Sequence, residues 1–130
     1  MAKFSPTSAA RLATCDERLQ RVFNEAIKHW DITILCGQRG QAEQEQAFKD
    51  GASTKHWPDS NHNTEPSQAV DASPYPIDWN DQHRWRYFAG LIIGLAAGMG
   101  IKLRSGVDWD GDLDLNEHKL KDAPHFEIAE

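Results

Sequence analysis

The amino-acid sequence predicts an α+β fold, in which helices pack on one small and mainly antiparallel sheet. Some segments carry apolar residues at steps of three and four, which is the spacing of one face of an amphipathic helix. Other segments are short, apolar or β-branched and end near glycine or proline, which is typical of strands. The order in which these segments follow one another along the chain favours the α+β class.

Two helices are predicted near the N-terminus. Ser5 is suited to an N-cap and Pro6 to the first helical turn, so a short helix is expected to run to Leu12. Asp16 would cap a second helix, with the acidic Glu17 in its first turn. The apolar residues of this second helix recur on one face, at Leu19, Val22, Phe23, Ala26, Ile27 and Trp30.

The remaining segments supply the sheet and two further helices. Residues 41–49 are rich in Gln, Glu and Ala, which are good helix formers, and Asp50-Gly51 ends that helix. Asn80 or Asp81 would cap the last helix, which is expected to run to about Met99. Strands are predicted at residues 31–36, 69–73, 101–104 and 126–128, and polar loops at residues 52–68 and 106–116.

Three glycines recur at four-residue spacing in the last predicted helix. They are Gly90, Gly94 and Gly98, within an apolar run that ends at Gly100. This run is far shorter than the roughly 20 apolar residues that cross a bilayer as a helix. We therefore expect no membrane insertion, and a buried helix whose glycines allow close packing.

Length and charge limit the classes of function. The chain of 130 residues is expected to form a single domain, residues 1–130, and to act as a monomer. Its formal net charge is −6 without any block of Lys or Arg, which argues against nucleic acid as a partner.

The cysteines and the N-terminus indicate where the protein is made. Cys15 and Cys36 are too few for a disulfide framework, so both are expected to be reduced and buried. Residues 1–6 lack the apolar core of a signal peptide. Synthesis in a cytoplasm, without an export signal of its own, is therefore expected.

Three separated segments carry side chains suited to metal binding. They contain His62 in the long polar loop, Asp71 in a short strand, and His125 before the last strand. Each has an ordinary alternative: a solvated loop histidine, a turn-capping aspartate, and a hydrogen-bonded core histidine. Together they supply two imidazoles and one carboxylate, a set that suits Zn²⁺ and leaves a fourth position for water.

Two further residues suit the hydrolysis of a peptide bond. A metal-bound water needs a carboxylate that takes its proton and passes it to the leaving amine. Asp122 lies three residues before His125, and a turn at Ala123-Pro124 would bring both side chains to one side. Arg39, just after the first predicted strand and Gly37, is the best candidate to stabilise the carbonyl oxygen under attack.

The order of these motifs resembles the M15 zinc peptidases. This family includes D-Ala-D-Ala carboxypeptidases, dipeptidases and phage L-alanyl-D-glutamate endopeptidases, and it shares a zinc fold with the hedgehog N-terminal domain. The resemblance extends from about Asp31 to Ile128. It rests on Gly37-Gln38-Arg39, Gln44, Gly51, Ser60-x-His62, Ala69-Val70-Asp71 and Asp122-x-x-His125.

The resemblance implies a zinc peptidase that cuts the L-Ala–D-Glu bond of peptidoglycan stem peptides. His62, Asp71 and His125 would bind zinc, Asp122 would act as base and acid, and Arg39 would hold the substrate carbonyl. The Asp, rather than Glu, before the last histidine is most similar to the phage endolysin branch. Such an enzyme would reach the cell wall from the host cytoplasm with a partner such as a holin.

Other functions remain open at this point. A D,D- or L,D-carboxypeptidase of the same fold would use the same zinc site, and a non-catalytic, metal-stabilised wall-binding module would need only the metal. The presence of Asp122 favours an enzyme, because a binding module has no use for a base beside the metal.

The chain also departs from the family pattern. In the family the aspartate lies seven positions after the first histidine, whereas Asp71 lies nine positions after His62 and the expected glycine is absent. Gln38 stands where an aromatic residue is common. We therefore expect an altered loop around His62 and an altered substrate groove.

An acidic segment near the C-terminus suggests a second metal. Aspartates at alternate positions bring carboxylates to one side of an extended loop, which suits Ca²⁺. The segment is not an EF-hand, because Lys119 falls where the final glutamate would stand. The alternative is a solvated acidic turn. The four residues in question are Asp108, Asp110, Asp112 and Asp114.

Several other polar and aromatic residues lie near these motifs. His56 is a rival to His62 as a zinc ligand, and Ser60 would fix the loop. Glu127 alternates with apolar neighbours and would face either the groove or solvent. Three tryptophans flank the motifs and could line a groove, namely Trp57, Trp79 and Trp109.

Overall fold

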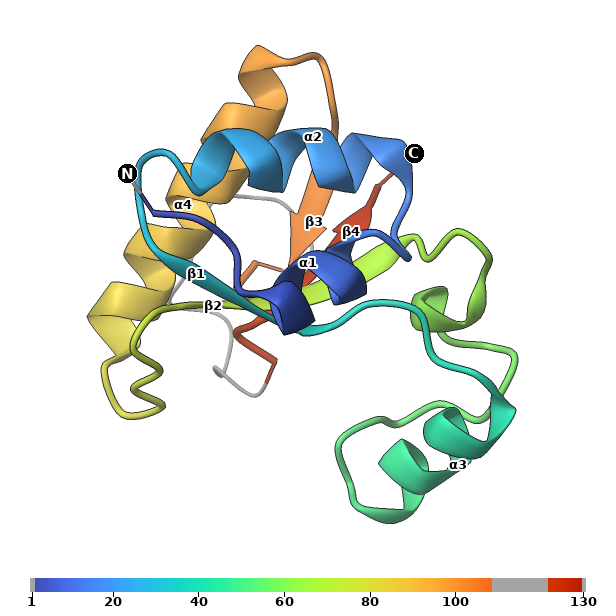
Figure 1. Ribbon diagram of the computed structural model, residues 1–130. Coiled ribbons are helices and arrows are strands. Elements are labelled where there is room, and N and C mark those ends of the chain that lie inside the picture. Colours follow the sequence, from blue (N-terminus) through green and yellow to red (C-terminus); the bar gives the residue numbers. More distant parts are fainter. Residues whose placement is uncertain (1, 109–121, 130) are drawn as a thin grey trace.

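The computed structural model describes residues 2–108 and 122–129, and its elements confirm the α+β prediction (Figure 1). Most boundaries lie within one or two residues of those expected from the sequence. The polar loop at 52–68 also contains a short 3-10 helix, η1. In chain order the elements are α1 (Pro6–Leu12), α2 (Glu17–Ala26), β1 (Ile32–Cys36), α3 (Gln41–Lys49), η1 (Asn61–Asn63), β2 (Ala69–Pro74), α4 (Gln82–Gly98), β3 (Leu103–Ser105) and β4 (His125–Ile128).

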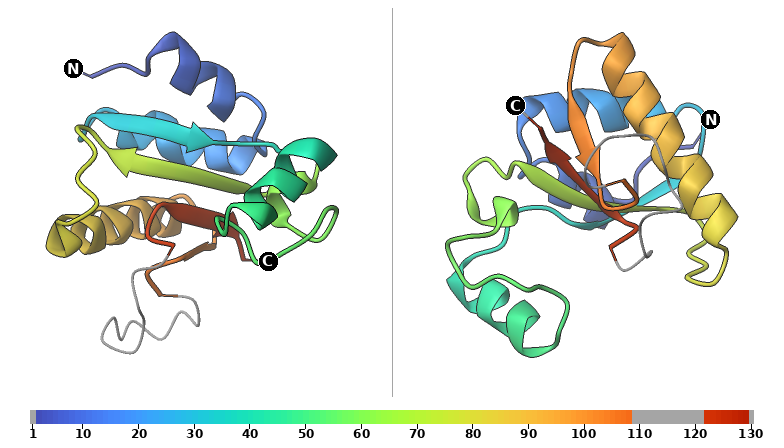
Figure 2. Two further views of the ribbon diagram at one scale, coloured as in Figure 1. Left: turned by 90° about the horizontal axis from the view of Figure 1, so that it is seen from below. Right: turned by 180° about the vertical axis from the view of Figure 1, so that it is seen from behind.

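The four strands form an antiparallel sheet in the order β1-β2-β4-β3. Successive side chains of a strand point to opposite faces, so each strand contributes one face to the core. On β4, Phe126 is fully buried and makes edge-on ring contacts with Phe23 of α2 and Phe88 of α4. The helices α2 and α4 pack against each other on this face (Figure 2). Residues that alternate with Phe126, such as His125, therefore face away from these helices.

Helix α1 covers the edge of the sheet that β1 forms. An edge strand presents unpaired backbone groups that a folded protein has to cover. The backbone N–H of Ile34 donates to Ser8 Oγ at 3.0 Å, and the Ile34 carbonyl accepts from Arg11 Nη1 at 3.0 Å. These side-chain bonds satisfy β1 on the side away from β2, and they fix the strand that leads to Gly37 and Arg39.

The expectation that the glycines of the last helix allow close packing is wrong. Gly90, Gly94 and Gly98 lie on the exposed side of α4, and a Cβ atom added at any of them would meet nothing within 4 Å. The core side of α4 is occupied instead by large apolar residues, including Trp85 and Phe88. Within the described residues, no helix is long and apolar enough to cross a membrane.

Candidate metal centre

Asp71 and His125 are brought together by the register of the sheet. Asp71 on β2 and His125 on β4 are directly paired positions, so their side chains lie next to each other on the same face. His125 Nδ1 lies 3.3 Å from Asp71 Oδ1. The same face and register place Cys36 of β1 on the other side of Asp71.

His62 reaches the same carboxylate oxygen from the η1 turn. Ser60 Oγ accepts a hydrogen bond from the His62 N–H at 3.2 Å, as the sequence predicted for a loop-fixing residue. The His62 carbonyl accepts from the Arg39 N–H at 2.7 Å, which ties the turn to the end of β1. His62 Nε2 thereby lies 3.3 Å from Asp71 Oδ1, despite the longer spacing between the two residues.

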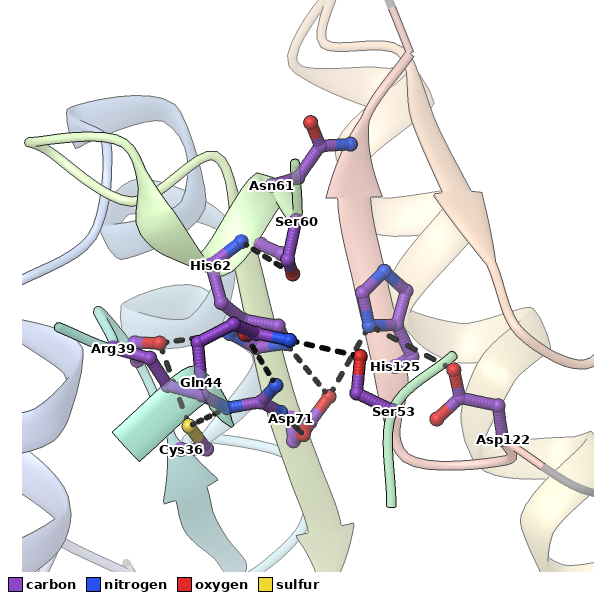
Figure 3. A network of polar contacts seen from close by, with 12 residues as sticks. Cys36, Arg39, Gln44, Ser53, Ser60, Asn61, His62, Asp71, Asp122 and His125 are labelled. Carbon is purple, nitrogen blue, oxygen red and sulfur yellow. Dashed lines mark hydrogen bonds and ion pairs between the residues drawn. The ribbon is translucent and has the colours of Figure 1, made fainter. Parts of the chain in front are cut away.

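These three side chains have the geometry of a metal site. One atom of each, namely His62 Nε2, Asp71 Oδ1 and His125 Nδ1, lies within 4.8 Å of the others (Figure 3). His62 Nε2 and Asp71 Oδ1 are buried and have no partner in hydrogen-bonding geometry. Since buried polar atoms are normally satisfied, a cation that accepts both lone pairs is the natural partner of this group. Among the described residues, these three alone form such a group.

Each histidine ring is oriented by a hydrogen bond that its other ring nitrogen, the one pointing away from the site, donates to an oxygen. His62 Nδ1 donates to the Gly37 carbonyl at 2.7 Å, and His125 Nε2 donates to Glu127 Oε1 at 2.7 Å. In the neutral imidazoles, these bonds leave His62 Nε2 and His125 Nδ1 with lone pairs directed at the site. The two rings are thus set in the tautomers that a metal requires.

Glu127, for which the sequence left open whether it faces the groove or solvent, lines the pocket beside His125. It is buried, and its second oxygen accepts from Asn61 Nδ2 at 3.0 Å and Arg104 Nη1 at 3.3 Å. The alternation of β4 places it on the same face as His125, and this was the available signal. Its partners could not be known without the neighbouring strand and the η1 turn.

The group is strongly charged when no metal is bound. Burial by itself would lower the pKa of both histidines, but the effect of the neighbouring Asp71 carboxylate is in the opposite direction and is larger. The pKa is therefore raised to about 10 for His62 and to about 9 for His125. Burial opposes ionisation of Asp71, yet the two histidines beside its carboxylate hold its pKa well below its usual range. A metal ion therefore has to displace protons from this site, so its affinity falls as pH falls.

Arg39 lies against the outer side of Asp71. Its guanidinium donates to Asp71 Oδ2 at 3.5 Å and to Gln44 Oε1 at 3.0 Å, and its Nε lies 3.3 Å from Cys36 Sγ. Gln44 is fully buried and also donates to Ser53 Oγ at 2.9 Å. Cys36 is a free thiol, as expected, but it is only half buried and belongs to the site rather than to the core.

Asp122 stands beside His125, as the predicted turn required. Its Oδ2 lies 4.0 Å from His125 Nδ1, and its side chain is 44% exposed. Partial burial raises the pKa of Asp122, and the nearby cations offset this effect only in part. Gly106 packs directly against the backbone of Asp122, since a Cβ atom added at Gly106 would collide with the Asp122 carbonyl.

The group formed by His62, Asp71 and His125, called the ligand group below, opens into a pocket that contains the predicted catalytic residues. The pocket is bounded on one side by residues 51–55, which follow α3, and on the other by β3 and β4. Arg39 and Asp122 both line it. The full lining is Arg39, Gly51, Ala52, Ser53, Thr54, Lys55, Ser60, Asn61, His62, Asp71, Arg104, Asp122, His125 and Glu127.

Other residues singled out from the sequence lie away from this pocket. His56 is paired with Glu45 at 2.9 Å and stacks on Phe48, so it is not a ligand in this arrangement. Trp57 and Trp79 are exposed and do not line the pocket. Trp109 lies outside the described residues.

The predicted calcium loop is described only at its beginning. The Asp108 N–H donates to the Ser105 carbonyl at 3.1 Å. Asp110, Asp112 and Asp114 lie outside the described residues, so calcium binding stays a prediction.

Comparisons with known proteins agree with this geometry. The profile of the phage L-alanyl-D-glutamate peptidase family matches residues 1–129. The L-alanyl-D-glutamate peptidase of Escherichia phage T5 is 33% identical over 136 residues, covering 98% of this chain and 98% of that protein. The crystal structure of the Serratia marcescens L-Ala D-Glu endopeptidase ChiX has the same fold, with a TM-score of 0.74 and 23% identity over 97% of this chain and 90% of that one. The chain therefore belongs to the phage L-alanyl-D-glutamate peptidase family.

Proposed function

We propose that this chain is a zinc-dependent endopeptidase that hydrolyses the L-Ala–D-Glu bond of peptidoglycan stem peptides, as a phage endolysin does. The observation that carries the proposal is the His62–Asp71–His125 group, with its unsatisfied buried atoms, at the base of a pocket that also holds Asp122 and Arg39. Membership of the family supplies the bond that is cut.

His62, Asp71 and His125 would hold the zinc ion. Two imidazoles and one carboxylate are a frequent ligand set of catalytic zinc, with a further position left for water or substrate. When bound, zinc supplies a water of lowered pKa and a Lewis acid for the peptide carbonyl. Gly37 and Glu127 orient the two imidazoles for this purpose through their far nitrogens.

Asp122 would move the proton during hydrolysis. Its carboxyl group faces the pocket beside His125 and has a raised pKa, which suits a group that first accepts and then donates a proton. It would take the proton of the attacking water and deliver it to the amine of D-Glu as the peptide bond breaks.

Arg39 would hold the carbonyl oxygen of the scissile bond. A guanidinium has five N–H donors, and three contacts, to Cys36, Gln44 and Asp71, leave further donors for the substrate. The same contacts keep the guanidinium in place before substrate binds, which is the condition for effective stabilisation of a developing oxyanion.

Mass spectrometry of purified peptidoglycan tests the proposal. The protein is incubated with peptidoglycan after zinc loading, and in parallel with a zinc chelator. New L-Ala carboxyl ends and D-Glu amino ends that vanish with the chelator are expected. Release of terminal D-Ala would show a carboxypeptidase instead, and no cleavage with zinc and calcium supplied would favour a wall-binding module.

The variant Asp122→Asn separates catalysis from metal binding. Loss of general acid–base catalysis is expected to lower kcat by about 10²- to 10⁴-fold, while the zinc content stays at that of the wild type. Asp59→Asn, an exposed loop substitution outside the pocket, serves as the control and should retain full activity. Full activity of Asp122→Asn would contradict the proposed proton transfer.

A further inference from the structure

The pocket differs in charge from the rest of the molecule. The chain has a formal net charge of −6, whereas the pocket, leaving aside the two histidines, is lined by equal numbers of cationic and anionic side chains. A divalent ion on the ligand group would make the pocket positive overall. An anionic substrate is therefore favoured locally, although the protein as a whole is acidic. The charged lining residues are Arg39, Lys55, Arg104, Asp71, Asp122 and Glu127.

Two of the cations in the pocket lie near the same carboxylate, that of Glu127. Arg104 on β3 is paired in register with Glu127 on β4, and its Nη1 lies 3.3 Å from Glu127 Oε2. The side chain of Arg104 is still 44% exposed, so its other donors reach the pocket opening. Lys55 lines the same pocket and is close enough to help lower the pKa of Glu127, which burial alone would raise.

The backbone of Lys55 is held by hydrogen bonds, whereas its ammonium group has no ion-pair partner among the described residues. Its carbonyl accepts a hydrogen bond from the buried Gln44 at 2.8 Å, and its N–H donates to Ser53 Oγ at 3.1 Å. Within residues 2–108 and 122–129, no carboxylate lies within ion-pair distance of its ammonium group. The single negative charge of Glu127 is already shared by His125, Asn61 and Arg104. The surroundings of Glu127 therefore have positive charge in excess.

The proposed substrate has a negative charge next to the bond that is cut. A glutamate residue has two carboxyl groups, and a linear peptide uses only one of them to continue the chain. The other is a free carboxylate on the residue that supplies the leaving amine, unless it is converted to an amide. Its distance from the scissile bond is fixed by the few bonds of the glutamate residue itself.

We propose that Lys55 and Arg104 form a carboxylate subsite that binds the free carboxyl group of the D-Glu residue. This inference rests on the proposed function and deepens it, because it makes the enzyme selective for stem peptides with unamidated D-Glu. Arg39, on the opposite side of the ligand group, stays available for the scissile carbonyl.

Two synthetic peptides that differ in one group test the subsite. Both contain the L-Ala–D-Glu bond in a stem-peptide sequence, and one carries the free carboxylate where the other carries a carboxamide. Hydrogen bonds to charged groups make contributions that correspond to about 10- to 100-fold in rate or affinity. We expect the zinc-loaded wild type to cleave the acid peptide with a kcat/KM about 10- to 100-fold above that of the amide peptide.

Variants of Lys55 then assign the preference. Lys55→Met is expected to bring the ratio of the two kcat/KM values to within about threefold, and Lys55→Glu to reverse it. Lys55 is exposed, so neither substitution should impair folding. Lys49→Met, at the end of α3 and outside the pocket, is the matched control and should retain the wild-type ratio. Arg104→Gln should lower the ratio in the same direction as Lys55→Met.

Equilibrium binding of the same peptides to the metal-free protein gives a readout without turnover. Isothermal titration calorimetry should show weaker binding of the amide peptide to the wild type, and no such difference for Lys55→Met. Equal cleavage of both peptides by the wild type would overturn the subsite and leave the proposed function intact. Cleavage of neither peptide by the zinc-loaded wild type would overturn both.

Discussion

His125 and His62 approach the same oxygen of Asp71 by different structural routes. His125 lies on a strand, where the pairing of β4 with β2 determines its position, and a side-chain carboxylate holds its far nitrogen. His62 lies on a short turn in a polar loop, and a backbone carbonyl, that of Gly37, holds its far nitrogen. One ligand is thus fixed by sheet register and the other by local hydrogen bonds.

This difference explains why the loop can vary and the strand cannot. A slip of one residue in a strand turns every side chain to the opposite face, so an insertion in β4 would remove His125 from the site. A loop can absorb extra residues at a small cost, provided that its ends stay anchored. The nine-position separation of His62 and Asp71 is accommodated in this way, since the Gln68 N–H still bonds the Asn61 carbonyl at 3.1 Å.

Removal of either ligand should have the largest effect. His125→Ala and His62→Ala each leave two ligands, so we expect loss of zinc at micromolar metal and a fall in activity of more than about 10³-fold. Zinc content by mass spectrometry and cleavage of peptidoglycan measure the two effects. His56→Ala, at the rival histidine that pairs with Glu45, should retain both. Zinc retention by His125→Ala would show that the strand ligand is dispensable.

The sequence could predict the ligands because each lies in a short local motif. His62, Asp71 and His125 were predicted as a group from their residue types and order, and the structure brings their side chains together although the loop between the first two is longer than in the family. The contact of Arg39 with Asp71 joins residues 32 positions apart and follows only from the fold. The contacts of Glu127 with Asn61 and Arg104 likewise follow only from the fold.

The expected packing role of the α4 glycines failed for a different physical reason. Four-residue spacing places Gly90, Gly94 and Gly98 on one helical face, but it does not say which face is buried. In α4 the larger aromatic and aliphatic side chains remove more apolar area from water, so they take the core side and leave the glycines in solvent.

A smaller effect is expected when Glu127, which accepts the hydrogen bond from His125 Nε2, is altered. Glu127→Gln keeps the shape of the side chain but removes its charge, so the hydrogen bond to His125 weakens while β4 stays in place. Zinc affinity should fall by about 10- to 100-fold, as measured by competition with a chromophoric chelator. Glu45→Gln, at a half-exposed carboxylate outside the pocket, is the control. Unchanged affinity would show that register alone orients His125.

The hydrogen-bond partner of His62 Nδ1 is the backbone carbonyl of Gly37, so it can be altered only by a substitution that shifts the backbone. A Cβ added at Gly37 would collide with the Arg11 carbonyl and Thr14 Oγ1, so Gly37→Ala must displace the strand end from α1. We expect a loss of about 1–3 kcal/mol in the free energy of unfolding, together with weaker zinc binding. Gly94→Ala is the matched control; in the open space around an exposed helical glycine it should stabilise by about 0.5–1 kcal/mol. Equal effects of the two substitutions, measured by urea unfolding, would contradict the close approach at Gly37.

The smallest effect concerns the junction of α1 and α2, which anchors the end of the His62 loop. The Asp16 N–H donates to the Ser67 carbonyl at 2.8 Å, and the Asp16 side chain caps α2 through the Arg18 N–H at 2.8 Å. The hydrogen bond from the Arg18 side chain is the largest cause of a lowered pKa of Asp16 in the folded state. Asp16→Ala should therefore cost about 1 kcal/mol of unfolding free energy at neutral pH.

This contribution should depend on pH with a definite sign. A carboxyl group whose pKa is lower in the folded state contributes stability above its unfolded pKa of about 4, and loses it as pH falls through the folded pKa. The stability difference between wild type and Asp16→Ala should therefore shrink below about pH 4, when urea unfolding is measured from pH 7 downward. Asp16→Asn keeps an N-cap without a titrating group, so its difference from Asp16→Ala should be nearly independent of pH. A constant wild-type difference across this range would mean that the cap acts without its charge, and that the loop anchor, unlike the buried ligand group, owes nothing to ionisation.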